Sequence, residues 1–250
     1  MNDRRKQIVD LINDRGAVNF SQLKAAFSVV SEMTLRSDLR ALDEEHLIVR
    51  VHGGAKSVDR IIGTDDLLNK RFCRNVEKKQ RIAEKAVQLL YPGTSVFLDS
   101  GSTLTEFARR FPDQSHLVFT SGIHCAMELA RLKNVQLYMI GGKVNASSMS
   151  ISGSDSCDKI REMNFDIAFL GATGYMKETG FNCGADEENA LKRAVISRTE
   201  TVVILMDSTK NDISNTFSFA SVQDVNIVVS DDELDEQTAE YFRNNKIAVI

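Results

Sequence analysis

Leu98-Asp99-Ser100-Gly101-Ser102-Thr103 follows the apolar pair Val96-Phe97 and precedes a helical pattern over residues 104–110. The turn in this stretch is small, contains glycine and is rich in hydroxyl groups. A strand that ends in such a turn and continues as a helix directs several backbone N–H groups outward at the positive end of the helix, which is how proteins bind phosphate. The stretch predicts an α/β fold with an anion site at the end of this strand.

Two further turns support this interpretation. Asp207-Ser208-Thr209-Lys210 and Gly141-Gly142-Lys143 each follow an apolar run, so each is expected at the C-terminal end of a strand. A single turn with Gly and Ser often does no more than connect a strand to a helix. Ligands of open parallel sheets bind at the C-terminal ends of the strands, and three such turns together favour a binding site there.

Beyond residue 94, apolar runs alternate with helical patterns. Such alternation predicts a mainly parallel sheet with helices on both faces. Strands are expected over 95–98, 117–120, 136–140, 167–170, 201–206, 226–229 and 247–250, and helices over 103–110, 124–132, 156–163, 187–198 and 233–244.

The first 57 residues predict three short helices. Helical spacing of apolar residues indicates a helix over 4–15, closed by Gly16, and a second over 21–27. Ser31 is a good N-cap for a third helix, in which Leu35, Leu39 and Leu42 share one face. Three short helices with a tight turn between the last two are typical of a helix-turn-helix unit.

The outer face of the third helix is polar, which fits either contact with DNA or a solvated surface. The apolar run 47–51 decides between them, because it turns sharply at Gly53-Gly54 and so predicts a wing hairpin packed against the helix. The expected DNA contacts are Ser31, Met33, Thr34, Arg36, Ser37, Arg40, Arg50 and His52.

The charge of the chain is uneven. The formal net charge of −4 argues against indiscriminate binding to nucleic acid. Through Lys56, however, nine Lys and Arg residues stand against eight Asp and Glu residues. If folding gathers them, these basic residues form a stripe facing phosphates: Arg4, Arg5, Lys6, Arg36, Arg40, Arg50 and Lys56.

The four cysteines are scattered, with no Cys-x-x-Cys pair, so neither a zinc site nor a disulfide framework is expected. Cys183 follows Phe181-Asn182 and could be a loop nucleophile, but a plain loop thiol is the favoured interpretation. No metal or cofactor is expected. The chain has no apolar run of the ~18 residues that cross a bilayer, so the cytoplasm is the expected compartment.

The chain as a whole resembles the DeoR-type bacterial transcriptional regulators. Residues 31–39, Leu42 and residues 47–55 look like the N-terminal signature of that family. The later motifs follow in the family's order: Asp99 to Thr103, Thr120-Ser121, Gly141-Gly142, Leu170-Gly171-Ala172, Glu188 with Lys192-Arg193, and Asp207 to Lys210.

The resemblance implies an α/β protein with a winged helix-turn-helix domain over 1–57 and a linker over 58–77. A Rossmann-like sensor domain over 78–250, similar to ribose-5-phosphate isomerase and CoA transferases, would follow. A phospho-sugar isomerase is therefore the alternative function. Residues 170–174 read Leu-Gly-Ala-Thr-Gly and lack the paired aspartates of the Asp-Gly-Ala-Asp motif in those isomerases. Binding without turnover is predicted, with no catalytic residue.

A repressor released by a phosphorylated sugar is the expected function, and an activator of the same architecture remains open. Palindromic operator DNA calls for at least a dimer, and the resemblance implies a homodimer or homotetramer. For Asp99 and Glu188, structural ion pairing is the alternative to contact with the effector. For Lys192 the alternative is a helix lysine that faces water. The expected effector contacts are Asp99, Ser100, Gly101, Ser102, Thr103, Thr120, Ser121, Gly141, Gly142, Glu188, Lys192 and Lys210.

Overall fold

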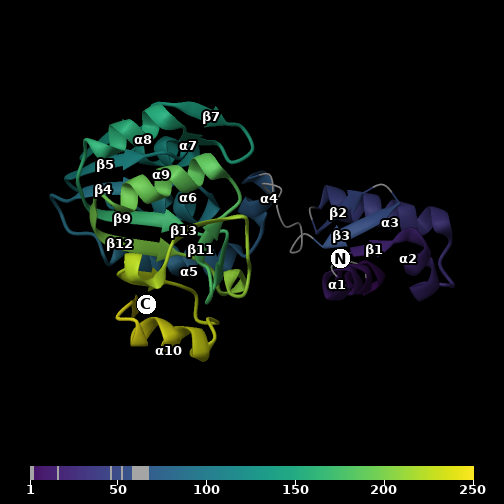
Figure 1. Ribbon diagram of the computed structural model, residues 1–250. Helices are drawn as coiled ribbons and strands as arrows, with labels where there is room; N and C mark the ends of the chain where they lie inside the picture. Colours follow the sequence, from purple (N-terminus) through teal and green to yellow (C-terminus); the bar gives the residue numbers. More distant parts are fainter. Residues whose placement is uncertain (1–2, 16, 46, 52, 58–67) are drawn as a thin grey trace. The chain divides into compact units, whose positions relative to one another are not determined.

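The computed structural model describes residues 3–15, 17–45, 47–51, 53–57 and 68–250. The chain divides into two compact units, Met1–Thr64 and Asp65–Ile250 (Figure 1). The N-terminal unit contains, in chain order, α1 (Asp3–Arg15), β1 (Ala17–Asn19), α2 (Phe20–Ala26), α3 (Glu32–Glu44), β2 (Ile48–Val51) and β3 (Gly54–Ser57).

The three predicted helices and the wing hairpin are present in this unit. Ser31 caps α3 as expected, because its side chain accepts a hydrogen bond from the backbone N–H of Thr34 at 3.1 Å. The sequence did not predict β1, which pairs with β3 to give an antiparallel sheet in the order β1-β3-β2. Gly54 permits this pairing, since a Cβ there would lie 2.3 Å from the carbonyl oxygen of Val18.

A buried carboxylate fastens α1 to α3, and it corrects the predicted basic stripe. The Nε atoms of Arg4 and Arg5 donate to the two carboxylate oxygens of Asp38, at 2.7 and 3.0 Å. Burial alone would raise the pKa of Asp38, but the two guanidinium groups outweigh it and hold that pKa below its usual value. Arg4 and Arg5 therefore serve the packing of the unit and are not laid out toward phosphates.

The C-terminal unit is built around a large sheet. Its elements are α4 (Leu68–Cys73), α5 (Val76–Val87), β4 (Ser95–Leu98), α6 (Ser102–Arg109), β5 (His116–Thr120), α7 (Ile123–Leu129), β6 (Val135–Met139), β7 (Lys143–Asn145), β8 (Ser150–Ser152), α8 (Ser154–Arg161), β9 (Phe165–Gly171), β10 (Gly174–Met176), β11 (Gly180–Cys183), α9 (Asp186–Ile196), β12 (Thr199–Leu205), η2 (Ser208–Lys210), β13 (Phe217–Ala220), η3 (Val222–Asp224), β14 (Ile227–Val229), α10 (Glu236–Asn244) and β15 (Ala248–Val249).

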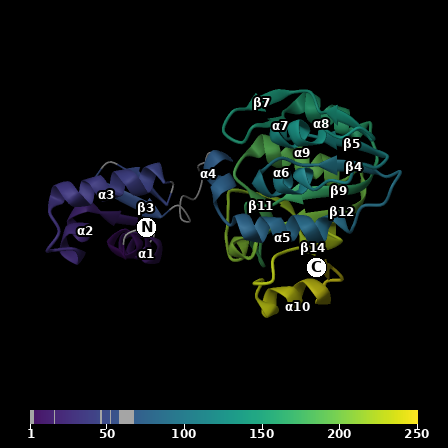
Figure 2. The same ribbon diagram turned by 180° about the vertical axis from the view of Figure 1, so that it is seen from behind.

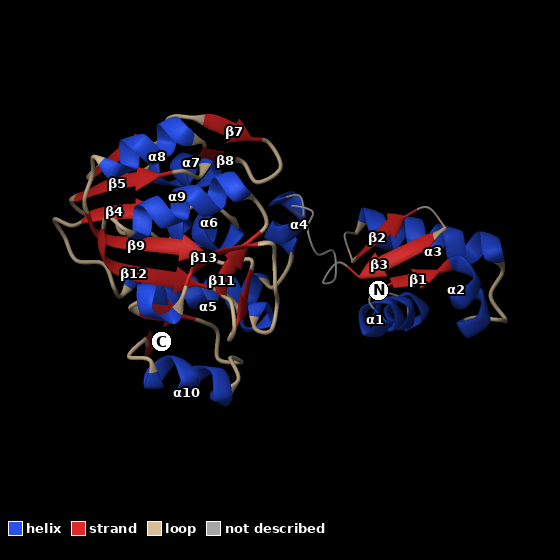
Figure 3. Cartoon of the chain, viewed as in Figure 1, coloured by secondary structure: helices blue, strands red, loops and turns tan. Residues whose placement is uncertain are grey.

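The large sheet has seven strands in the order β15-β14-β12-β9-β4-β5-β6, and every neighbouring pair is parallel. All seven are strands predicted from apolar runs. Helices α8 and α9 cover one face and α5, α6 and α7 the other (Figures 1 and 2). The predicted α/β fold with a mainly parallel, doubly covered sheet is confirmed (Figure 3).

Two smaller sheets were not predicted. Strands β10, β11 and β13 form an antiparallel sheet, and β7 pairs with β8 as a hairpin. These strands are three or four residues long, too short for a clear alternation of apolar and polar residues. Short strands of this kind depend on tertiary partners rather than on their own sequence.

The strand order reverses between β4 and β9. From β4 the chain adds β5 and β6 on one side, whereas β9 is followed by β12, β14 and β15 on the other. The loops that leave β4 and β9 therefore diverge and open a crevice at the C-terminal ends of the two strands. None of the helices in the described ranges is both long enough and apolar enough to cross a membrane.

Candidate functional site

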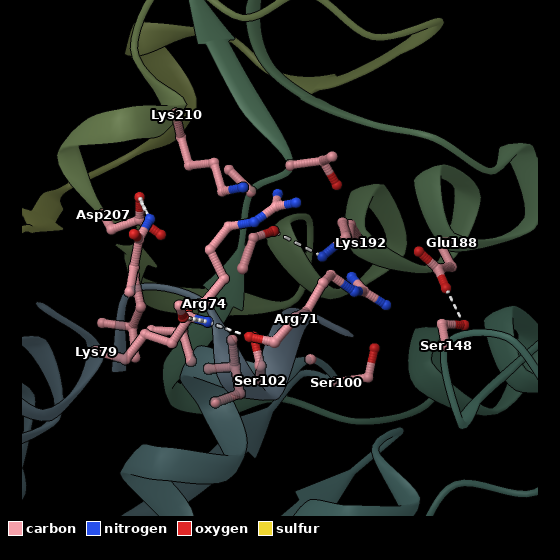
Figure 4. Close-up of a pocket in the computed structure, with 18 residues that line it drawn as sticks. Arg71, Arg74, Lys79, Ser100, Ser102, Ser148, Glu188, Lys192, Asp207 and Lys210 are labelled. Atoms are coloured by element: carbon pink, nitrogen blue, oxygen red, sulfur yellow. Dashed lines mark hydrogen bonds between the residues drawn. The ribbon is translucent and has the colours of Figure 1, made fainter. Parts of the chain in front are cut away.

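A pocket lies at this reversal of strand order. It is formed by the α4–α5 segment, the turns after β4, β9 and β12, the β7–β8 loop and one face of α9 (Figure 4). The residues that line it are Arg71, Arg74, Asn75, Lys79, Ser100, Gly101, Ser102, Thr103, Leu104, Ser148, Gly171, Ala172, Thr173, Glu188, Lys192, Leu205, Asp207 and Lys210.

The turn from Ser100 to Thr103 contributes the start of a helix to the pocket. Gly101 is the N-cap of α6 and has φ of +112°, in the region that favours glycine. The first turn of a helix has backbone N–H groups without intrahelical partners, and the helix dipole makes this end positive. All four residues of this turn line the pocket, and anion binding by their backbone N–H groups stays a prediction.

Asp99, just before that turn, is engaged in a buried ion pair. Lys192 Nζ contacts Asp99 Oδ2 and also donates to the carbonyl oxygen of Gly171 at 2.8 Å. Asp99 Oδ2 accepts a further hydrogen bond from the backbone N–H of Gly171, at 3.1 Å. Burial alone would lower the pKa of Lys192, but the Asp99 carboxylate outweighs it and raises that pKa. The pair therefore ties β4, β9 and α9 together, which is the structural alternative left open by the sequence.

Three more cationic residues of the lining were not predicted: Arg71, Arg74 and Lys79. Lys79 is 6% exposed, and its Nζ donates to the backbone carbonyls of Arg71 and Arg74. Burial lowers the pKa of Lys79 to about 8, and the positive charges of Lys210, Arg74 and Arg71 push it in the same direction. The Asp207 carboxylate acts in the opposite direction. This side of the pocket therefore holds four cationic side chains and one carboxylate. A run of basic residues over 70–81 was the available signal.

The other side of the pocket is acidic and rich in hydroxyl groups. Glu188 Oε1 accepts hydrogen bonds from Ser148 Oγ at 2.7 Å and from Ser150 Oγ at 3.0 Å. Ser148 is 2% exposed and comes from the β7–β8 loop, which the sequence did not connect to the site. A carboxylate beside serine hydroxyls is suited to binding the hydroxyl groups of a polyol or sugar.

Five predicted effector contacts lie outside the lining that the described residues form: Asp99, Thr120, Ser121, Gly141 and Gly142. Thr120 Oγ1 accepts from the backbone N–H of Gly122 at 3.0 Å, and Ser121 Oγ donates to Asp99 at 3.4 Å. The carbonyl oxygen of Gly141 accepts a hydrogen bond from Ser156 Oγ at 2.7 Å, and a Cβ at Gly142 would lie 2.1 Å from Ser156 Oγ. Thr120, Ser121, Gly141 and Gly142 pack the loops beside the pocket. Asp99 contacts two lining residues, Lys192 and Gly171.

The expected DNA contacts fall mostly on one exposed face of α3. Met33 is 83% exposed, and Arg36, Ser37 and Arg40 are exposed beside it. The guanidinium of Arg36 lies over the ring of Phe20, with its carbon 4.2 Å from the ring centroid.

The remaining expected DNA contacts have mixed surroundings. The hydroxyls of Ser31 and Thr34 lie 2.8 Å apart within the helix cap. Arg50 is exposed on the wing, and its backbone N–H donates to Asp43 Oδ1 at 3.0 Å, which joins the wing to α3. His52 lies outside the described residues.

All four cysteines are free thiols, and the described part of the chain has no group of three or more His, Cys, Asp and Glu side chains that could hold a metal ion. Burial raises the pKa of Cys125 to about 12 and that of Cys183 to about 11. Both side chains are therefore protonated thiols at neutral pH, and Cys183 lacks the acidity of a nucleophile.

Comparison with known proteins assigns both units. Residues 4–61 match the DeoR-like helix-turn-helix domain, and residues 74–232 match the DeoR C-terminal sensor domain. The chain is 30% identical to the HTH-type transcriptional regulator GolR of Listeria innocua, over 99% of this chain and 97% of that protein. It is 28% identical to the glycerol-3-phosphate regulon repressor of Escherichia coli K12, over 91% and 90% of the two chains. Among solved structures, ribose 5-phosphate isomerase A of Methanocaldococcus jannaschii aligns with a TM-score of 0.41, at 20% identity over 55% of each chain.

The buried pair predicts strong coupling between Asp99 and Lys192. Lys192→Met leaves Asp99 as an uncompensated buried charge and should lower the free energy of unfolding by about 3–5 kcal/mol. The double variant Asp99→Asn/Lys192→Met should cost clearly less than the two single changes added together. Urea denaturation of the four proteins measures this coupling. Additive costs would contradict the pairing described above.

Lys79 predicts a rise in stability with pH. Because its pKa is about 8 in the folded protein and 10.5 in the unfolded chain, the folded protein releases the proton first. The free energy of unfolding should therefore increase by about 2 kcal/mol from pH 7.5 to 9.5 through this group. Urea denaturation at both pH values, compared with Lys79→Met, isolates the contribution. An identical pH dependence in the variant would refute it.

Proposed function

This chain belongs to the DeoR family of transcriptional regulators, and we propose that it represses a sugar-metabolism operon until a phosphorylated sugar binds its sensor domain. The observation that carries the proposal is the polarity of the pocket, cationic around one edge and acidic with serine hydroxyls at another. A molecule with a phosphate and several hydroxyl groups matches both.

The phosphate is assigned to the start of α6. Backbone N–H groups from Ser100 to Thr103 and the helix dipole stabilise an anion there, and Lys210 adds a positive charge from the turn after β12. Lysine suits this role because its ammonium acts as a mobile point charge with three donors. The sugar hydroxyls are assigned to Glu188, with Ser148 as its neighbour in the pocket.

The regulator has the components of a switch rather than of a catalyst. The E. coli relative named above is a repressor, and a repressor needs a DNA reader and a ligand site whose occupancy favours one arrangement of the readers. We assign DNA reading to the exposed face of α3 and to the wing. A palindromic operator requires two readers, so the working form is proposed as a homodimer or homotetramer that acts in the cytoplasm.

The DNA assignment predicts that two arginines dominate operator affinity. Arg36→Ala and Arg40→Ala should each weaken binding by roughly 5- to 150-fold, because a good contact to a base or phosphate contributes about 1–3 kcal/mol. The measurement is a gel-shift titration with a fragment that the purified protein selects from random DNA. Arg131→Ala, which changes an exposed arginine two residues after α7, is the matched control and should bind as wild type does. Unchanged affinity in both test variants would refute the assigned face.

The effector assignment predicts a selective loss of ligand binding. In a thermal-shift panel of glucose 6-phosphate, fructose 6-phosphate, ribose 5-phosphate and glycerol 3-phosphate, at least one compound should stabilise the protein. At about 100 times its dissociation constant, the gain is about 2.7 kcal/mol. Ser102→Asp, which puts a carboxylate at the phosphate position, should abolish the shift and keep DNA binding. Lys210→Ala should reduce the shift.

The structure offers a matched control for this variant. Ser154 begins α8 after Gly153, whose φ of +113° parallels that of Gly101, but Ser154 is exposed and outside the pocket lining. Ser154→Asp should respond to the panel as wild type does. If Ser102→Asp still responds to the effector, the pocket is not the sensor.

A further inference from the structure

The segment 71–79, which spans the end of α4 and the start of α5, forms one wall of the pocket; we call it the entry segment. It contributes Arg71, Arg74, Asn75 and Lys79 to the lining. In the sequence it lies shortly after residues 58–67, through which the chain passes from the N-terminal unit to the C-terminal one. The entry segment therefore lines the pocket and is also close in sequence to the residues that lead to the N-terminal unit.

The entry segment is fastened to the turn that carries Lys210. Asn75 adopts a left-handed conformation with φ of +51°, and its Nδ2 donates to Asp207 Oδ1 at 3.1 Å and to Thr209 Oγ1 at 3.0 Å. Lys78 Nζ donates to Ser208 Oγ at 2.7 Å and pairs with Asp231 at 3.1 Å. The segment thus has a defined docked position against the sensor domain.

Arg71 brings unused hydrogen-bonding capacity into the pocket. Within the described residues, its Nε and Nη2 are buried and have no hydrogen-bond partner. Figure 4 shows the side chains of Arg71 and Arg74 extending into the pocket from this segment. Buried N–H groups without an acceptor are costly, and an anion that accepts hydrogen bonds from them removes that cost.

The surrounding charges favour a ligand of high negative charge. The lining holds five cationic side chains (Arg71, Arg74, Lys79, Lys192 and Lys210) and two carboxylates (Glu188 and Asp207). The charge of Lys192 is neutralised by its ion pair with Asp99, which lies outside the lining. In an empty pocket the cations repel one another across the interface between the entry segment and the sensor sheet. A dianion bound between these cations attracts both sides, so the interface is then held together by electrostatic attraction.

We propose that Arg71 binds the phosphate of the effector together with the Ser100–Thr103 turn, so that an occupied pocket holds α4 in its docked position. This inference rests on the function proposed above. It names the ligand class, a phosphate monoester dianion, and the element through which ligand binding is transmitted, α4. Sensing then follows from differential affinity: a ligand that contacts Arg71 binds the docked segment more tightly than the undocked one. A neutral sugar, without the charge that Arg71 requires, leaves α4 unchanged.

Two measurements on the full chain with inorganic phosphate as the probe test this inference. Isothermal titration calorimetry gives affinity, and amide hydrogen exchange of the peptide containing residues 68–73 reports the docking of α4. Saturating phosphate should slow this exchange in the wild-type protein. Arg71→Gln should weaken phosphate binding about tenfold or more and lose the slowing, because a charge-assisted hydrogen bond is removed. Arg81→Gln is the matched control, since Arg81 lies on α5, half exposed and outside the pocket, and it should behave as wild type.

Arg71→Lys keeps the inference testable if Arg71→Gln does not fold. Lysine retains the charge but not the paired N–H groups of arginine, so phosphate binding should be weakened severalfold. Wild-type affinity and wild-type slowing of α4 in the Arg71 variants would overturn the inference. If Ser102→Asp at the same time abolishes phosphate binding, the proposed function stands and only the role of Arg71 fails. If Ser102→Asp also binds phosphate as wild type does, both fail.

Discussion

The buried pair between Asp99 and Lys192 is the interaction on which the sensor domain depends. It joins the end of β4, the end of β9 and the face of α9 at the point where the order of the strands reverses. Ion pairs of this kind add little net stability, but they tolerate only one geometry, because either charge alone would be buried without compensation. The pair therefore fixes where the Ser100–Thr103 turn lies. It also aligns Glu188, which is four residues before Lys192 and so shares its face of α9.

The pocket beside this ion pair has cationic groups at one edge and an acidic, hydroxyl-rich surface at another. Helix-terminal N–H groups and cationic side chains gather around one edge, and a carboxylate held by two serine hydroxyls occupies another. The basic residues of the entry segment join the first edge, although they lie next to the chain's passage toward the DNA-binding unit. In that unit a second buried carboxylate, Asp38, is held by Arg4 and Arg5 and fixes α3 against α1. Each unit thus contains buried ion pairing close to the surface that we propose binds DNA or the effector.

Much of the fold follows from local signals in the sequence. Apolar runs placed all seven strands of the parallel sheet, and Ser31 marked the start of α3, because periodicity and capping act over a few residues. The turn after β4 was predicted as part of the site for the same reason. The features that could not be predicted from the sequence depend on contacts between residues far apart in the chain. β1 forms only against β3, Ser148 reaches Glu188 from a loop 40 residues away, and Arg71 meets the pocket through the docking of the entry segment. Thr120 and Gly142 were expected at the ligand, but tertiary packing commits them to neighbouring loops.

If this pocket binds a phosphorylated sugar in the proposed way, the sugar takes a single orientation. A crystal structure of the protein with a stabilising sugar phosphate would then show electron density for the phosphate at the start of α6, within hydrogen-bond distance of the backbone of Ser102 and Thr103. The sugar hydroxyls would be directed toward Glu188. A phosphate bound elsewhere on the protein, or a sugar in the reverse orientation with its phosphate at Glu188, would rule out this binding mode.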